Sequence, residues 1–138
     1  VRLERQSTIL ARLKNWRQSL QISWKEPLFG VGFNTYRYVQ RNFGFIAREN
    51  WQETHSGAGA DSSLLFVLAT TGIIGLIAYL NLIVKIIKFG GKNKKLVSTA
   101  SMAGLLVHSC FNNSLFYPWI MLWSWLVWGE EIKECSEQ

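Results

Sequence analysis

The sequence predicts an all-α integral membrane protein that carries an extracytoplasmic segment with an amphipathic helix. Two long uncharged apolar stretches lie in the second half of the chain, at residues 62–84 and 96–129. A helix needs about 20 apolar residues to cross about 30 Å of hydrocarbon. The mean hydropathy of +0.08 conceals this, because it averages a polar first half with an apolar second half.

Residues 8–25 are expected to form the amphipathic helix. Ser7 can cap its N-terminus, and Pro27 prevents its continuation. Between these two positions apolar side chains recur every three or four residues, at Ile9, Leu13, Trp16, Leu20 and Trp24. The basic side chains beside them suit a helix lying along lipid headgroups, and packing against neighbouring helices explains the pattern equally well.

A compact turn is expected at residues 27–33, because Gly30 and Gly32 permit a left-handed backbone. These two glycines lack the third glycine of a dinucleotide-binding loop, so we reject a Rossmann site. Residues 34–53 then mix aromatic and basic side chains, among them Arg37. Such a surface suits sugars and phosphates, and its expected place outside the cytoplasm argues against nucleic acid as a partner.

The topology follows from the lysines. The link between the two apolar stretches holds Lys85, Lys88, Lys92, Lys94 and Lys95. Short lysine-rich links stay in the cytoplasm. The five lysines also account for much of the net charge of +6. The expected order is an extracytoplasmic loop (1–61), a transmembrane helix (62–88), a cytoplasmic loop (89–95), two short transmembrane helices broken near 112–118 (96–129) and a tail (130–138).

Asp61 is expected to cap the first membrane helix, with a catalytic role as the second explanation. Gly72 and Gly75 are expected to give that helix a thin side that another helix can approach. Because Asp61 is the only aspartate, no Asp-x-Asp pair can hold a divalent cation against a phosphate. Arginine binds phosphate oxygens without a metal. Arg12 and Arg17 are therefore the first candidates for a phosphate-binding role.

His55 and His108 are the only histidines, and no neighbouring ligand gives either of them a zinc-like spacing. We therefore expect no metal and no cofactor. His55 lies at the junction between the polar segment and the first membrane helix, where it is either a turn residue or a catalytic base. For His108, inside the second apolar stretch, helix packing is the leading explanation and catalysis the second.

The two cysteines, Cys110 and Cys135, lie in different environments and imply no disulfide framework. Val1 leads directly into charged sequence, without the basic start and apolar centre of a signal peptide. We expect the chain to be the C-terminal part of a longer protein.

Four short motifs follow one another between residues 9 and 80. They are Arg12-Leu13-Lys14-Asn15-Trp16, Pro27-Leu28-Phe29-Gly30-Val31-Gly32-Phe33, His55-Ser56, and Leu65 through Thr71-Gly72-Ile73-Ile74-Gly75-Leu76. Each motif is weak by itself, but the ordered set resembles the O-antigen ligase and polymerase superfamily.

The resemblance implies the C-terminal part of a polytopic helical bundle of the GT-C type in the bacterial inner membrane. It implies a metal-independent glycosyltransferase that moves a glycan from an undecaprenyl diphosphate carrier onto the hydroxyl of a glycan, lipid or protein acceptor. His55 matches the loop histidine that activates the acceptor, and Arg12 matches a loop arginine that binds the donor diphosphate. The residues between His55 and the helix, Ser56 to Asp61, depart from the usual pattern. Since family members have more membrane helices, this part alone is expected to be inactive.

Two alternatives remain open from the sequence. The first is a polysaccharide polymerase of the same superfamily, which extends another carrier-linked chain. The second is a non-catalytic membrane scaffold or transporter component, whose loop binds a partner through aromatic and basic side chains. Catalysis expects Arg12 and His55 to face one cavity, whereas a scaffold does not need the two side chains to be close.

Overall fold

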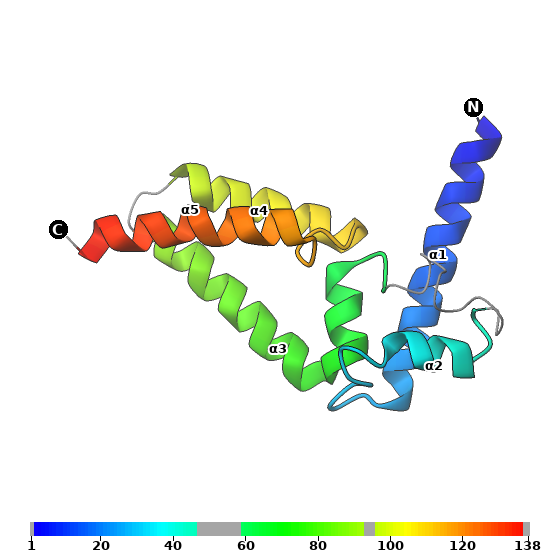
Figure 1. The fold of residues 1–138 in the computed structure, drawn as a ribbon. Coiled ribbons are helices and arrows are strands. Elements are labelled where there is room, and N and C mark those ends of the chain that lie inside the picture. The colour runs from blue at the N-terminus through cyan, green and yellow to red at the C-terminus, as the bar shows by residue number, and fades with distance from the viewer. Residues whose placement is uncertain (1, 47–58, 93–95, 137–138) are drawn as a thin grey trace.

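A computed structural model describes residues 2–46, 59–92 and 96–136, and these form five α-helices (Figure 1). They are α1 (Arg2–Lys25), α2 (Tyr36–Asn42), α3 (Ser63–Lys92), α4 (Leu96–Phe111) and α5 (Pro118–Ser136). The predicted all-α class is confirmed. One apolar segment, Ser63–Phe89 in α3, is long enough to cross a membrane, and α4 and α5 contain the shorter apolar segments Thr99–Phe111 and Pro118–Val127.

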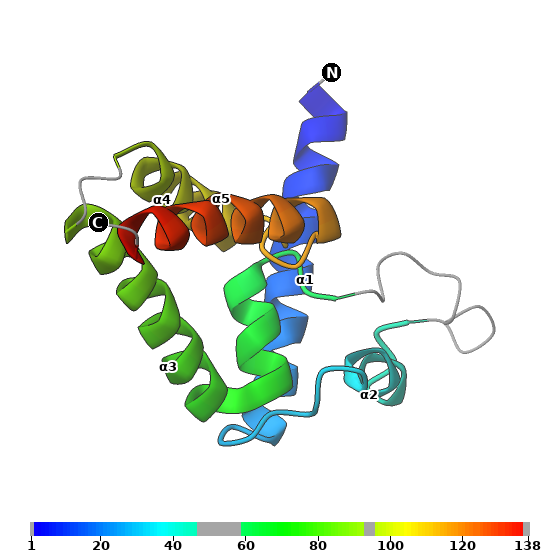
Figure 2. The same ribbon diagram turned by 60° about the vertical axis from the view of Figure 1, so that its left-hand side comes forward.

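Helix α3 is bent sharply at Gly72, whose φ of 69° and ψ of −169° are not helical. Figures 1 and 2 show the result as a V, with residues 63–71 beside α1 and residues 73–92 leading away from it toward the far ends of α4 and α5. The second limb has about 20 residues and a length of about 30 Å. It is uncharged up to residue 84 and then carries Lys85, Lys88 and Lys92. The stretch that the sequence predicts as a single helix thus consists of two limbs.

The loop after α1 supplies hydrogen-bond acceptors to the bend. In an unbroken helix, the amides of Ile73 and Ile74 would donate to carbonyls four residues earlier in α3. Here the Ile73 N–H donates to the carbonyl oxygen of Pro27 at 2.9 Å, and the Ile74 N–H donates to that of Leu28 at 3.4 Å. The bend therefore does not leave these two amides without partners.

The same loop supplies donors to the two carbonyls that the bend releases. The Val31 N–H donates to the Ala69 carbonyl at 2.9 Å, and the Gly32 N–H donates to the Thr70 carbonyl at 2.8 Å. Both pairs of exchanged bonds join backbone groups of the loop to backbone groups of α3. Four bonds between the loop and α3 replace two bonds within α3.

The loop glycines allow this contact. Gly30 and Gly32 have φ angles of 67° and 91°, which confirms the predicted left-handed turn. The sequence predicts a second helix against Gly72 and Gly75, and at Gly72 this is wrong. The backbone of the loop lies against Gly72, and the nearest side chain to Gly75 is that of Thr71 in its own helix. A loop can approach more closely than a helix because it brings backbone rather than side chains to the contact.

Helix α1 packs against the rest of the protein through a face that is mostly polar. Ser19, Ile22 and Ser23 are buried there, and the Tyr36 hydroxyl of α2 lies 2.8 Å from the Ser19 hydroxyl. Of the apolar stripe that the sequence predicts, Trp16 is half-buried, and the side chains of four members are exposed: Ile9, Leu13, Leu20 and Trp24. The stripe is therefore not the face that packs within the described residues.

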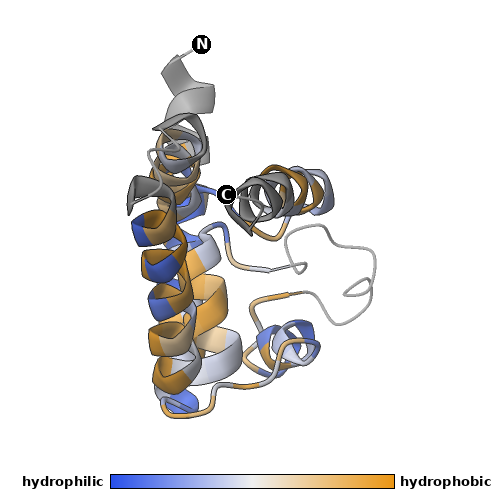
Figure 3. Ribbon diagram, turned by 90° about the vertical axis from the view of Figure 1, so that its left-hand side faces the viewer, coloured by the Kyte–Doolittle hydropathy of each residue, from blue (hydrophilic) through white to orange (hydrophobic). Residues whose placement is uncertain are grey.

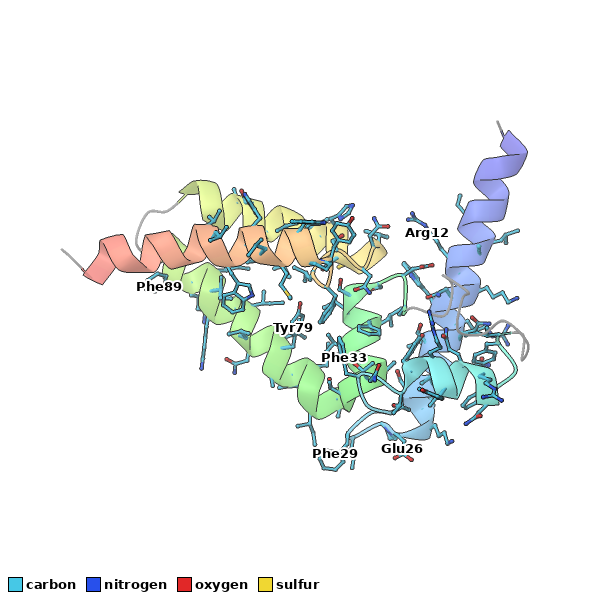
Figure 4. All side chains as sticks on the ribbon, viewed as in Figure 1. Arg12, Glu26, Phe29, Phe33, Tyr79 and Phe89 are labelled. Atoms are coloured by element: carbon cyan, nitrogen blue, oxygen red, sulfur yellow. The ribbon has the colours of Figure 1, made fainter. Side chains whose placement is uncertain are left out.

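The core lies between α1, α2 and the first limb of α3, and it contains Ile22, Tyr36, Ala60, Phe66 and Ala69. The ring of Phe66 packs against those of Phe33 and Phe116, with centroids 5.2 and 5.4 Å away. Figure 4 shows Phe33 and Tyr79 inside the angle of the V. In Figure 3 apolar residues predominate along α3, whereas α2 is mostly hydrophilic.

Candidate functional site

Three elements meet at the N-terminal end of α3: helix α1, the first residues of α3 itself, and the turn between α4 and α5. One link to α1 is a hydrogen bond in which the Asp61 N–H donates to Oδ1 of Asn15 at 2.9 Å. Arg12 lies almost one helical turn before Asn15 and thus on the same side of α1. This bond brings Arg12 and Asp61 together across a long interval of sequence.

The electrostatics at this point join the same two residues. Asp61 is half-buried, and loss of solvation raises the pKa of its carboxyl group above the ordinary 3.8. The guanidinium of Arg12 acts in the opposite direction and lowers that pKa. Arg12 is exposed, so its charge faces both the carboxylate and whatever approaches from solution.

The N-terminal cap of α3 is Ser62, and the prediction that Asp61 is the cap is wrong by one residue. The Leu65 N–H donates to Oγ of Ser62 at 3.5 Å, the bond expected from the residue directly before the helix. The Ser62 hydroxyl in turn donates to the Ser109 carbonyl of α4 at 3.3 Å. The cap thus fastens the start of α3 to α4, and the Asp61 side chain is not used for capping.

Ser63 ties the start of α3 to the turn between α4 and α5. Its hydroxyl lies 3.2 Å from Oδ1 of Asn113 and 3.3 Å from the carbonyl of Asn112, and it accepts a hydrogen bond from the Leu115 N–H at 3.3 Å. The buried position of Ser63 explains why its hydroxyl is fully used. The start of α3 is therefore a polar junction.

The end of α4 also reaches α1. The rings of Trp16 and Phe111 lie 6.1 Å apart and are tilted by 35°. The indole N–H of Trp16 is buried and has no hydrogen-bond partner among the residues that the structure describes. Trp16 follows Arg12 by four residues, so both side chains lie on the side of α1 that faces the junction.

His108 lies on α4 near the junction, and both of its ring nitrogens contact residues of the turn between α4 and α5. Nδ1 lies 2.5 Å from the hydroxyl oxygen of Ser114, and Nε2 lies 3.1 Å from the amide nitrogen of Asn112. The ring is otherwise exposed. These two contacts indicate that His108 stabilises the turn between α4 and α5.

The other predicted site residues are not all brought to this point. Arg17 is five positions after Arg12, which places it about 140° farther round the helix, and its side chain is exposed. Arg37 is half-buried in α2. His55 lies outside the described residues. Across residues 2–46, 59–92 and 96–136, no three His, Cys, Asp or Glu side chains are grouped so that they could hold a metal ion.

Sequence reasoning missed Asn15 and Ser62 as parts of the junction. The two consecutive serines after Asp61 carried a signal for the cap, because each of them is as good a capping residue as aspartate. Nothing in the spacing pointed to Asn15, since its partner Asp61 is 46 residues away.

Comparison with known proteins places the chain in a family. A family model described as O-antigen ligase matches residues 3–80, which include α1, the loop, α2 and the bend of α3. The chain belongs to the O-antigen ligase family. Members of this family are membrane glycosyltransferases that use lipid-linked glycans, and the predicted resemblance is confirmed.

A distant relative agrees with this assignment. The chain is 34% identical over 97 residues to the exopolysaccharide production protein ExoQ of Rhizobium meliloti (strain 1021). The similarity covers 67% of this chain and 21% of the relative, so the chain spans about a fifth of that protein's length. No solved structure matches the chain.

Proposed function

We propose that the chain is part of a bacterial inner-membrane glycosyltransferase that moves a glycan from an undecaprenyl diphosphate carrier onto an acceptor hydroxyl. In this proposal residues 1–61 lie on the periplasmic or extracellular side, where the carrier presents its glycan. The enzyme works with neither a metal nor an organic cofactor. The chain supplies one wall of the site and is inactive without the rest of its protein.

The observation that carries the proposal is the Asn15–Asp61 hydrogen bond, which holds Arg12 at the N-terminal end of α3. A diphosphate leaving group gains negative charge as its bond to the sugar breaks. A fixed guanidinium beside it stabilises that charge, and the start of a helix favours anions as well. Arg12 is therefore assigned to the donor diphosphate.

Asp61 gives Arg12 a defined place without neutralising it completely. Because the carboxylate is only half-buried and its pKa is raised, its own charge is poorly solvated and attracts the guanidinium. When an anionic donor enters, Arg12 can exchange part of this contact for bidentate bonds to phosphate oxygens. Arg17 and Arg37 contribute to binding only as more distant positive charge.

His55 is assigned to the acceptor, whose hydroxyl it activates by accepting a proton as the sugar is transferred. This role is carried over from the family's loop histidine, because His55 lies outside the described residues. An imidazole changes charge near neutral pH, which suits a base that must accept one proton in each turnover. His108, whose ring nitrogens are both engaged, is assigned to the structure of the turn.

A polysaccharide polymerase is the second candidate, and the relative's role in exopolysaccharide production favours it. The two activities differ in the acceptor: a ligase uses a lipid, protein or wall polymer, and a polymerase uses a second carrier-linked chain. A non-catalytic scaffold or transporter component is the third candidate.

Transfer by the full-length protein in membrane vesicles tests these roles. The vesicles receive radiolabelled carrier-linked glycan and, in separate reactions, a lipid acceptor or a second carrier-linked chain. His55→Ala and Arg12→Ala should each abolish most of the transfer at equal expression and insertion, whereas Lys14→Ala, on the same helix as Arg12, should not. Wild-type activity in both site variants would remove the two residues from the chemistry and favour a scaffold.

A further inference from the structure

The tip of the loop that fills the α3 bend is apolar and exposed. Leu28 and Phe29 expose 57% and 74% of their surfaces, although they lie between two tightly packed segments. Figure 4 shows Phe29 at the outer tip of the bend, projecting away from the helices. Apolar side chains in this position need a cover that the described residues do not supply.

This tip continues the exposed apolar surface of the membrane-crossing limb. The Leu28 carbonyl accepts the Ile74 N–H, so the two residues are neighbours. Ile73, Ile74 and Ile77 are about half exposed, and they belong to the apolar segment long enough to cross a membrane. Whatever covers this side of α3 also reaches the loop tip, and lipid suits an apolar face on a segment of membrane-crossing length.

Four polar groups of the loop backbone meet a condition that lipid imposes. Irregular backbone enters the hydrocarbon region only where its polar groups are satisfied by protein, because lipid offers no hydrogen bonds. The carbonyls of Pro27 and Leu28 accept amides of α3, and the amides of Val31 and Gly32 donate to carbonyls of α3.

We propose that Leu28 and Phe29 insert into the acyl-chain region of the bilayer leaflet at the start of the crossing limb, as a membrane anchor of the extracytoplasmic segment. The flanking residues fit the border of that leaflet. Trp24 is exposed and suits the headgroup level, and Lys25 and Glu26 keep their charges in water. The anchor fixes the depth of α1, and through it the depth of Arg12.

The test measures the depth of single labels on the full-length protein in nanodiscs of phosphatidylethanolamine and phosphatidylglycerol. Native cysteines are replaced by serine, and an environment-sensitive NBD fluorophore is attached at Phe29→Cys or, in a second variant, at Leu28→Cys. Glu26→Cys provides the matched control three residues earlier, and Ile77→Cys provides the lipid-exposed reference. Quenching by nitroxide on the acyl chains is compared with quenching by aqueous iodide.

Labels at positions 28 and 29 should emit at shorter wavelength, be quenched by the acyl-chain nitroxide as at position 77, and resist iodide. The label at position 26 should show the reverse. Iodide quenching at both tip positions would show a solvated loop, and protection from both quenchers would show that protein covers the tip. Either result overturns the proposal. The measurement does not depend on glycan transfer, so it stands apart from the proposed function.

Discussion

Gly30 and Gly72 lie back to back where the loop crosses the bend of α3. A Cβ atom added to Gly72 would come within 2.2 Å of the Leu28 carbonyl oxygen, and one added to Gly30 would come within 2.4 Å of the Thr70 carbonyl carbon. Both residues also have positive φ angles, of 69° and 67°. The loop and α3 can exchange their hydrogen bonds only because neither residue carries a side chain.

Gly72→Ala and Gly30→Ala are therefore expected to destabilise the protein severely. Each combines backbone strain of about 1–3 kcal/mol with a clash against backbone that cannot move aside. The measurement is thermal unfolding of the purified protein in detergent. We expect both variants to unfold at much lower temperature than wild type or to fail to insert.

Two other glycines separate these effects. Gly44 has a φ of 70° and open space around it, so Gly44→Ala should show the strain alone, at about 1–2 kcal/mol. Gly104 lies within α4 with nothing near its missing Cβ, so Gly104→Ala should be neutral or slightly stabilising. If Gly72→Ala proved no worse than Gly44→Ala, the close approach of the loop would be contradicted.

The glycine pattern shows how far the sequence could lead. Gly30 and Gly32 predicted a left-handed turn, because that preference is local to each residue. The partner of the turn could not be predicted, since the bend at Gly72 lies 40 residues away and within a stretch whose composition is typical of one continuous helix. Pairing between distant segments leaves no periodic signal in a single sequence.

Replacement of Asn15 should loosen the junction at the start of α3. Asn15→Leu removes the acceptor of the Asp61 N–H and should cost about 1 kcal/mol in the free energy of unfolding. Glycan transfer should fall as well, because Asp61 and Arg12 lose their common position. Unfolding and transfer are both measured in the full-length protein.

Asn15→Asp keeps an oxygen at the acceptor position, so it should retain more of both properties than Asn15→Leu. Gln21→Leu serves as the control, because Gln21 is exposed on the same helix. Equal losses in the Leu and Asp variants would argue against the hydrogen bond as the cause.

The Ser19–Tyr36 pair makes an asymmetric prediction. The Ser19 hydroxyl donates to the Asn15 carbonyl at 2.9 Å, so the Tyr36 hydroxyl must donate to Ser19. Ser19→Ala leaves a tyrosine hydroxyl buried without an acceptor and should cost about 1–3 kcal/mol, whereas Tyr36→Phe removes the donor and should cost about 1 kcal/mol. Chemical denaturation checks this order. A double variant much less stable than Ser19→Ala would show that the two hydroxyls do not act as a pair.

The pH dependence of stability follows from Asp61. Its pKa is raised in the folded protein, so the folded state holds this proton more tightly than the unfolded chain. The free energy of unfolding should therefore fall as pH rises from 3.8 through the raised pKa, and this contribution should be constant above it. Thermal unfolding of wild type and Asp61→Asn over this range measures the difference.

Asp61→Asn should lack this part of the pH dependence. Arg12→Ala should extend it to higher pH, because the guanidinium no longer lowers the carboxyl pKa. A wild-type profile that Asp61→Asn reproduces would contradict the assignment to Asp61.

The candidate site was predicted in part. Arg12 is recognised by residue type, since an arginine binds phosphate oxygens without a metal, whereas Asp61 is expected from the sequence mainly as a helix cap. That Arg12 rather than Arg17 lies at the junction depends on which face of α1 packs inward, and most of the apolar stripe lies on a different face. Buried serines such as Ser19 satisfy their hydroxyls by local and interhelical bonds, which composition does not reveal.

The most direct test of the account compares donor binding in Arg12→Ala and Arg17→Ala, as the KM for carrier-linked glycan in the full-length protein. Loss of a charged hydrogen bond to phosphate should raise the KM of Arg12→Ala about tenfold to a hundredfold. Arg17→Ala, altered on a different side of the same helix, should change it much less. An unchanged KM in Arg12→Ala, or an equal rise in both variants, would contradict the assignment of the diphosphate to the junction at the start of α3.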